Sequence, residues 1–76
     1  MIIYIKTLNG TKISLIVEQN QLINTIKLYI EEKEGIPVNQ IRLIYNGTKL
    51  NDTNTINDYN IQSYSVIHMI LASRGG

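Results

Sequence analysis

Few residues of this chain could act as chemical catalysts. His68 is the only histidine, cysteine is absent, and no serine stands in the turn that exposes a hydrolase nucleophile. A nucleophile needs a base within hydrogen-bond reach, so an acyl-transfer site cannot be assembled from these residues. Asp52 and Asp58 lack the spacing of a calcium loop, and the chain has no glycine-rich phosphate-binding pattern. The sequence therefore predicts a protein that is not an enzyme and that carries no metal and no cofactor.

The end of the chain suggests a different chemistry, in which this protein is the reactant. No apolar residue other than an alanine follows Leu71, so we expect residues 72–76 to form a flexible, extended tail. The tail ends in Arg74, Gly75 and Gly76, and glycine can enter a tunnel too narrow for a Cβ atom. Such a tail could present the Gly76 carboxylate to the active site of another protein. The alternative is that these small residues are only a frayed chain end without a function.

Apolar residues outside the expected core indicate a surface for partners. In the segment 40–45, alternation places Ile44 on the side opposite Leu43. In the last strand the same alternation places His68 and Ile70 on the side opposite the core residues. If these strands are neighbours, one exposed cluster forms from Leu8, Ile44, His68 and Ile70, bordered by Lys6, Arg42 and Lys49. Scattered exposure of single apolar residues is the alternative.

One hairpin and one helix are predicted in the first half of the chain. The hairpin consists of residues 2–7, the turn Asn9-Gly10, whose residues supply the positive φ angles of a tight turn, and residues 12–18. From 23 to 34 the apolar residues recur at helical spacing, and Gly35 ends the helix. No good N-cap residue precedes Ile23, so we expect packing to hold the helix start more than capping does.

The second half contains another hairpin and a final strand. Residues 40–45 alternate, Asn46-Gly47 gives a turn, and a short return strand follows. Thr55 and Asp58 have the spacing of a capping box, which predicts a short helical turn. The last strand, 65–71, has in core phase Ile67, Met69 and Leu71. The order ββαββ, with a short helical turn before the last strand, predicts an α+β fold in which one mixed sheet covers one helix.

Length and charge limit the classes of protein to consider. The 76 residues suit one domain, predicted at 1–71, with 72–76 as its tail. Seven Lys and Arg against six Asp and Glu give a net charge of +1, which argues against nucleic-acid or membrane partners. No apolar segment is long enough for a membrane span, no signal peptide is evident, and the lack of cysteine suits a reducing compartment. We expect a monomer in the cytoplasm and nucleus.

Several segments along the chain match one known family. They are Met1, Ile3, Lys6-Thr7-Leu8, Gly10, Lys33-Glu34-Gly35-Ile36-Pro37, Arg42-Leu43-Ile44, Asp58-Tyr59-Asn60-Ile61-Gln62 and Arg74-Gly75-Gly76. Together they resemble the ubiquitin family, without a gap over all 76 positions. The resemblance implies a β-grasp fold and a role as a protein modifier.

The resemblance also implies a mechanism and a set of partners. In this family an activating enzyme adenylates the terminal carboxylate with ATP, and conjugating and ligating enzymes deliver it to a lysine of a target protein. Gly76 would be the attached residue, preceded by Gly75 and Arg74. Receptor domains would read the Ile44 patch, which we define as Leu8, Arg42, Ile44, His68 and Ile70. The resemblance also implies deconjugating proteases as partners.

Some positions depart from ubiquitin itself. Ubiquitin has an arginine at the position of Ala72, which its activating enzyme reads, whereas the cullin-modifying relative has an alanine there. Tyr45 and Asn51 also look like that relative, while Asn60 and Gln62 look like ubiquitin. A cullin-type modifier is therefore an alternative within the same family.

The lysines that could accept a further modifier differ as well. The possible acceptors are Lys6, Lys12, Lys27, Lys33 and Lys49. Thr48 and Ser63 replace the acceptors of the two main chain types of ubiquitin. Lys12 and Lys49 lie one residue along from acceptor positions, which turns a strand side chain to the opposite face. The resemblance implies that Lys27 pairs with Asp52 and is poorly accessible.

Two alternatives belong to other classes of protein. A β-grasp sulfur carrier also ends in two glycines, but the exposed Ile44 patch disfavours that reading. A non-conjugated interaction domain or decoy would only occupy receptors, and the Gly75-Gly76 terminus disfavours it. We therefore predict a ubiquitin-like modifier that is attached through Gly76 and recognised through the Ile44 patch.

Overall fold

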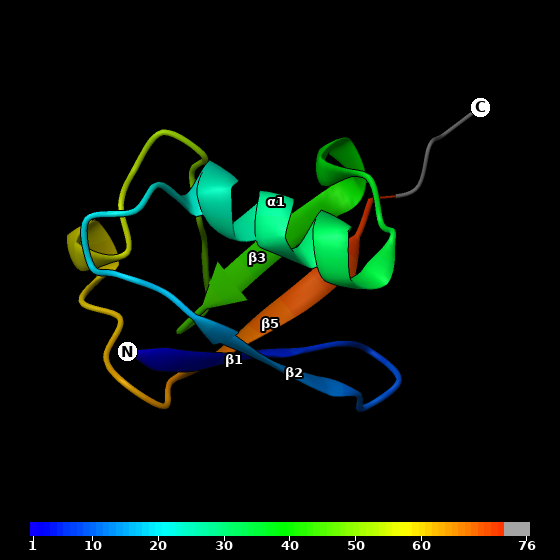
Figure 1. Cartoon of the computed structure of the whole chain (residues 1–76), viewed down its shortest axis with the longest axis horizontal. Coiled ribbons are helices and arrows are strands. Elements are labelled where there is room, and N and C mark those ends of the chain that lie inside the picture. The colour runs from blue at the N-terminus through cyan, green and yellow to red at the C-terminus, as the bar shows by residue number, and fades with distance from the viewer. Residues whose placement is uncertain (73–76) are drawn as a thin grey trace.

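The regular elements follow one another in the predicted order, with one addition (Figure 1). The computed structural model describes residues 1–72. The elements are β1 (Ile2–Lys6), β2 (Lys12–Ile16), α1 (Ile23–Glu34), β3 (Ile41–Tyr45), β4 (Thr48–Lys49) and β5 (Val66–Leu71), with short 3-10 helices at Val38–Gln40 and Asn57–Tyr59. With β4 counted, the order is ββαβββ; β4 is the predicted short return strand of the second hairpin, and the addition is the 3-10 helix at Val38–Gln40.

The strands form one five-stranded sheet in the order β2-β1-β5-β3-β4. The central strands β1 and β5 are parallel, and the other neighbouring pairs are antiparallel. The helix α1 lies across one face of this sheet (Figure 1). The arrangement is a β-grasp fold, so the predicted α+β class and the mixed sheet covering one helix are confirmed.

The two Asn-Gly turns differ in geometry. Asn46 and Gly47 have φ angles of 52° and 74°, as a two-residue hairpin loop requires. In the first hairpin only Gly10 has a positive φ, and the Gly10 amide donates to the Thr7 carbonyl at 3.1 Å. The prediction that Asn9 also takes a positive φ is therefore wrong. The loop between β1 and β2 is longer, so one glycine is enough to reverse the chain.

The helix α1 obtains its N-terminal partners from a distant loop. Leu22 makes no side-chain cap, as predicted. Instead the amide of Ile23 donates to the carbonyl of Asn54 at 2.8 Å, and the amide of Asn24 donates to that of Asp52 at 3.2 Å. These bonds satisfy donors that a helix start otherwise leaves unpaired. Gly35 ends the helix in the left-handed conformation, with a φ of 73°.

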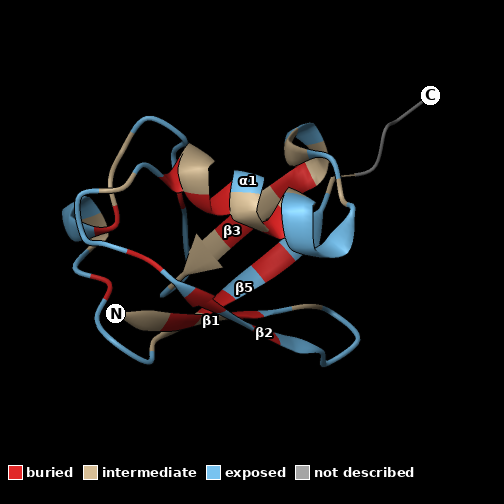
Figure 2. Ribbon diagram, viewed as in Figure 1, coloured by how far each residue is buried: buried red, intermediate tan, exposed pale blue. Residues whose placement is uncertain are grey.

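The core lies between α1 and the inner face of the sheet, where buried positions alternate with more exposed ones along the strands (Figure 2). Ile23, Ile26 and Ile30 of the helix are completely buried against it. Ile67 and Met69 are buried as predicted, whereas Leu71 is 49% exposed. The prediction for Leu71 is wrong because this residue ends β5 at the rim of the core, where it lines an open hollow.

Candidate functional site

Strand pairing brings the predicted residues of β3 and β5 together on the outer face of the sheet, which is turned away from α1. Ile44 pairs with His68 across β3 and β5. Arg42 pairs with Ile70 two residues further along the same strands. Directly paired residues point to the same face, so these four side chains are neighbours. Ile44 and Arg42 are half-buried, while His68 and Ile70 are exposed.

The row that contains Ile44 and His68 continues across the sheet through charged residues. His68 pairs with Lys6 of β1, and Ile44 pairs with Lys49 of β4. Lys6 is in turn opposite Lys12 of β2. Lysines therefore flank the apolar centre of the Ile44 patch on both sides.

Leu8 is placed differently from the other predicted patch residues. It lies in the loop between β1 and β2 and is 82% exposed. It lines a hollow of about 330 Å³ together with Ile36, Met69 and Leu71. Ile36 and Leu71 are surface residues that the sequence pattern does not indicate. In the sequence, Ile36 stands among the residues that end the helix, and strand alternation predicts that Leu71 points into the core.

Within the described residues, the strands of the sheet carry basic but no acidic side chains. None of the six acidic residues lies in a strand; they are in α1, a 3-10 helix or loops, at Glu18, Glu31, Glu32, Glu34, Asp52 and Asp58. The outer face of the sheet carries basic residues, namely Lys6, Lys12, Arg42 and Lys49. A net charge of +1 thus conceals a cationic face. Such a face suits a partner that surrounds an apolar contact with carboxylates.

The lysines differ in the freedom of their amino groups. The side chain of Lys27 is only 6% exposed, and its Nζ lies 2.5 Å from Oδ1 of Asp52, so the predicted pair is present. The Nζ of Lys33 donates to the carbonyl of Ser14 at 3.0 Å. Lys6, Lys12 and Lys49 are exposed. Thr48 pairs with Tyr45 and Lys49 with Ile44, so these adjacent residues point to opposite faces, as predicted.

The hydrogen bonds of the fold extend to residue 72. The amide of Ala72 donates to the carbonyl of Gln40 at 2.7 Å. Ala72 is therefore tied to the segment before β3, although the sequence pattern assigned this residue to the tail. Arg74, Gly75 and Gly76 lie outside the described residues.

The described part of the chain contains neither a metal-binding cluster nor a membrane-spanning helix. Within residues 1–72, no three His, Asp or Glu side chains gather in a way that could hold a metal ion. The described residues contain no helix with the length and apolar character needed to cross a membrane.

Known proteins resemble this chain along its whole length. The model of the ubiquitin family matches residues 3–74. Ubiquitin-like protein 1 of Schizosaccharomyces pombe is 45% identical over 76 residues, which cover 100% of this chain and 97% of the relative. The ubiquitin-like protein NEDD8 of Dictyostelium discoideum is 43% identical, and the NEDD8-like protein RUB1 of Saccharomyces cerevisiae is 41% identical; each match covers 100% of this chain and 99% of the relative. The chain therefore belongs to the ubiquitin family and is a ubiquitin-like modifier, not itself an enzyme.

Proposed function

We propose that this modifier is joined to other proteins through the carboxylate of Gly76. The observation that carries the proposal is the motif Arg74-Gly75-Gly76 in a chain that matches ubiquitin-like proteins over its full length. An activating enzyme would form an acyl-adenylate from the carboxylate and ATP, with release of pyrophosphate. A cysteine of that enzyme would displace AMP to give a thioester, and a target lysine would finally displace the thiol. The chain supplies only the carboxylate, so it needs no cofactor of its own.

We propose further that the Ile44 patch is the surface on which receptor domains dock. Its apolar centre, Ile44 and Ile70, is contiguous through strand pairing and is flanked by cations. An exposed apolar surface rimmed by polar groups is typical of a docking site. The other partners in this proposal are conjugating and ligating enzymes and deconjugating proteases, and the protein acts as a monomer in the cytoplasm and nucleus.

The activating enzyme that we propose is of the NEDD8 type. Ala72 supports this choice, since an enzyme that reads an arginine at this position would lose charge-assisted hydrogen bonds. The similarity to NEDD8 of Dictyostelium discoideum and to RUB1 of Saccharomyces cerevisiae supports it as well.

The proposal is tested by a charging assay. The protein is incubated with ATP and, separately, with purified activating enzymes of the NEDD8 and ubiquitin types, and the thioester is detected on a non-reducing gel. We expect a reducible adduct with the NEDD8-type enzyme. Gly76→Ala should abolish or strongly slow it, because the added Cβ collides in a channel shaped for glycine. If neither enzyme is charged while the protein still binds receptors, the non-conjugated interaction domain replaces this proposal.

A further inference from the structure

The chain contains the tripeptide Asn-Gly-Thr twice, at residues 9–11 and 46–48. The first copy lies in the loop between β1 and β2, and the second begins with the two-residue loop between β3 and β4. The side-chain amide of an asparagine can react with the backbone nitrogen of a following glycine, because glycine has no Cβ to hinder the approach. Since the two local sequences match, a difference in reactivity between Asn9 and Asn46 comes from the fold.

Hydrogen bonds restrain the first copy. The amide of Gly10 donates to the carbonyl of Thr7 at 3.1 Å. The Oδ1 atom of Asn9 accepts from the hydroxyl of Thr7 and from the amide of Thr11, the latter at 3.2 Å. Attack of the Gly10 nitrogen on the side chain of Asn9 requires that both groups turn away from these partners. The bonds must therefore break before Asn9 can react.

The second copy has no such restraint. Within residues 1–72, no hydrogen bond holds the side chain of Asn46 or the backbone amide of Gly47. Both residues are exposed, and a Cβ atom built on Gly47 would have no heavy atom within 4 Å. The attacking nitrogen and the attacked amide are thus free, and water reaches both.

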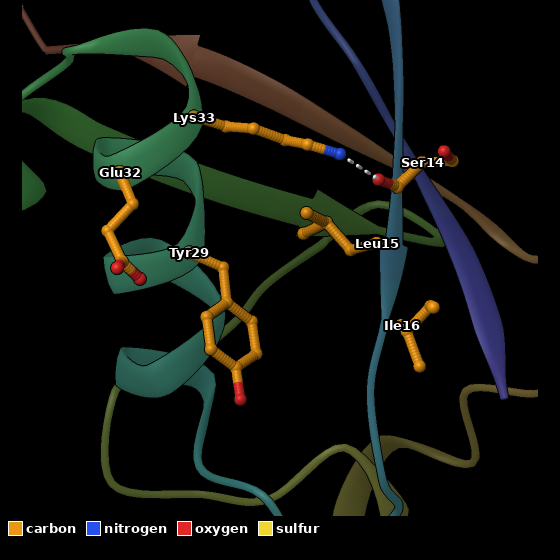
Figure 3. A pocket seen from close by; sticks show the side chains of 6 residues that line it. All are labelled: Ser14, Leu15, Ile16, Tyr29, Glu32 and Lys33. Carbon is orange, nitrogen blue, oxygen red and sulfur yellow. Dashed lines mark hydrogen bonds between the residues drawn. The ribbon is translucent and has the colours of Figure 1, made fainter.

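The strands beside the two loops also differ in how firmly they are held. Five residues of β2 pair with β1, and Lys33 of α1 reaches across to the carbonyl of Ser14 on β2 at 3.0 Å (Figure 3). At the opposite edge of the sheet, β4 pairs with β3 through Thr48 and Lys49 alone. A short strand at a sheet edge opens locally at low cost. The backbone rotation that the reaction requires at Asn46 is therefore accessible in the folded protein.

Asn60 shows that backbone conformation alone does not create this site. Its φ angle of 54° is close to the 52° of Asn46. The next residue, however, is the β-branched and buried Ile61, whose amide donates to the carbonyl of Ile56 at 3.4 Å. Of the three asparagines, Asn46 alone combines a following glycine with a free amide.

We propose that Asn46 is a site of spontaneous deamidation in the folded protein. The nitrogen of Gly47 attacks Cγ of Asn46, the bond from Cγ to the side-chain nitrogen breaks, and that nitrogen leaves as ammonia with the proton of the Gly47 amide. Water then opens the resulting succinimide at either carbonyl, which gives aspartate or isoaspartate. One water molecule is consumed and one ammonia molecule is released, and the step needs no enzyme and no cofactor.

The products change the border of the Ile44 patch. The new carboxylate lowers the net charge of the chain from +1 to 0. It lies two residues after Ile44, in the turn that leads to Lys49, the cross-strand partner of Ile44. Isoaspartate also adds one carbon to the backbone of the two-residue loop. A receptor that surrounds its apolar contact with carboxylates would be repelled, a consequence that rests on the proposed function of the patch.

Mass spectrometry of the full chain tests the proposal. The protein is incubated at mildly alkaline pH in heavy-oxygen water, which labels each product as it forms, and electron-transfer fragmentation distinguishes isoaspartate from aspartate. We expect Asn46 to convert at least about tenfold faster than Asn9, because the hydrogen bonds of Asn9 and Gly10 must break first. In denaturant the two residues should react at similar rates, since the matching local sequence then controls both.

Matched variants separate the chemistry from its consequence. Thr7→Val should accelerate the conversion of Asn9 and leave that of Asn46 unchanged, and Asn46→Gly, which retains the positive φ angle, should abolish the early product. Asn46→Asp imitates one product and should weaken binding to receptor domains about threefold. Asn60→Asp adds the same charge at nearly the same φ angle and should leave binding unchanged.

Two results would overturn the proposed site. One is conversion of Asn9 as fast as that of Asn46 in the folded protein. The other is a rate difference that persists in denaturant, which would assign it to the local sequence instead of the fold. Unaltered receptor binding by Asn46→Asp would overturn the consequence for the patch. If the wild-type protein binds no receptor, the proposed function of the patch fails, whereas the mass measurement still decides the reaction at Asn46.

Discussion

Ile44 of β3 and His68 of β5 are direct cross-strand partners on the outer face of the sheet, while the adjacent pair, Leu43 and Met69, is buried on the inner face. One step along the same two strands thus separates a surface contact from a core contact. Functional and structural effects of substitution should therefore differ sharply between neighbouring residues.

Ile44→Ala should weaken binding to ubiquitin-family receptor domains by about tenfold, since loss of a buried isoleucine contact is enough to decide a micromolar interaction. It should change the thermal midpoint little. The matched control is Leu43→Ala, where a fully buried side chain is lost and the free energy of unfolding should fall by about 2–5 kcal/mol. Calorimetric binding and denaturant unfolding of both variants measure these effects. A large loss of stability with Ile44→Ala would contradict the assignment of this residue to the patch.

Ala72→Arg should improve charging by the ubiquitin-type activating enzyme. An arginine can form charge-assisted hydrogen bonds worth about 1.5–3 kcal/mol with an acidic site, and alanine forms none. The amide of Ala72 is bonded to Gln40 through the backbone, so the substitution leaves this contact in place. Initial rates of thioester formation provide the measurement. A wild-type protein that the ubiquitin-type enzyme already charges as fast as ubiquitin would refute the role of position 72.

When this protein is the only modifier in a ligation assay, we expect mono-adducts or chains through Lys6 or Lys33. Thr48 and Ser63 have no amine to attack a thioester, and Lys27 is buried with Asp52. Mass spectrometry of the digested products identifies the linked lysines. Abundant chains through Lys49 would mean that a shift by one residue, onto the outer face of the sheet, is tolerated.

The pair of Lys27 and Asp52 should respond unequally to the loss of each partner. Asp52→Ala leaves an ammonium group that is almost fully buried without its counter-charge, and we expect a cost of about 1–3 kcal/mol. Lys27→Met leaves a half-exposed carboxylate that water can solvate, and the new side chain fills the same volume. Denaturant unfolding should show the smaller loss for Lys27→Met. Equal losses would indicate that direct attraction, rather than burial, dominates.

The capping box of Thr55 and Asp58 should act as a unit. The amide of Thr55 donates to Oδ2 of Asp58 at 2.8 Å, and the amide of Asp58 donates to Oγ1 of Thr55 at 3.1 Å. Thr55→Ala and Asp58→Ala should each lower the free energy of unfolding by about 0.5–2 kcal/mol. The double variant, measured in the same way, should cost less than the sum if the two bonds depend on one another. Full additivity would count against a cooperative box.

Features that depend on residues close together in the chain could be predicted from the sequence alone. The bounds of α1, the reversal at Asn46-Gly47 and the box of Thr55 and Asp58 follow from periodicity, backbone preference and side chains a few residues apart. The alternation of β3 was enough to place Ile44 opposite Leu43. The family was also recognisable from motifs spread along the chain.

Features that depend on residues distant in the sequence could be identified only in the folded structure. The carbonyls of Asn54 and Asp52 complete the start of α1, and Lys33 reaches the edge of β2 at Ser14. Leu71 is exposed because it lies at the rim of the core, although strand alternation directs its side chain to the core face. Strand order and the position of α1 fix these contacts, and neither leaves a local pattern in the sequence. The free edge of β2 is known only from the strand order of the sheet, because the residues of a strand do not indicate on which side another strand pairs with it.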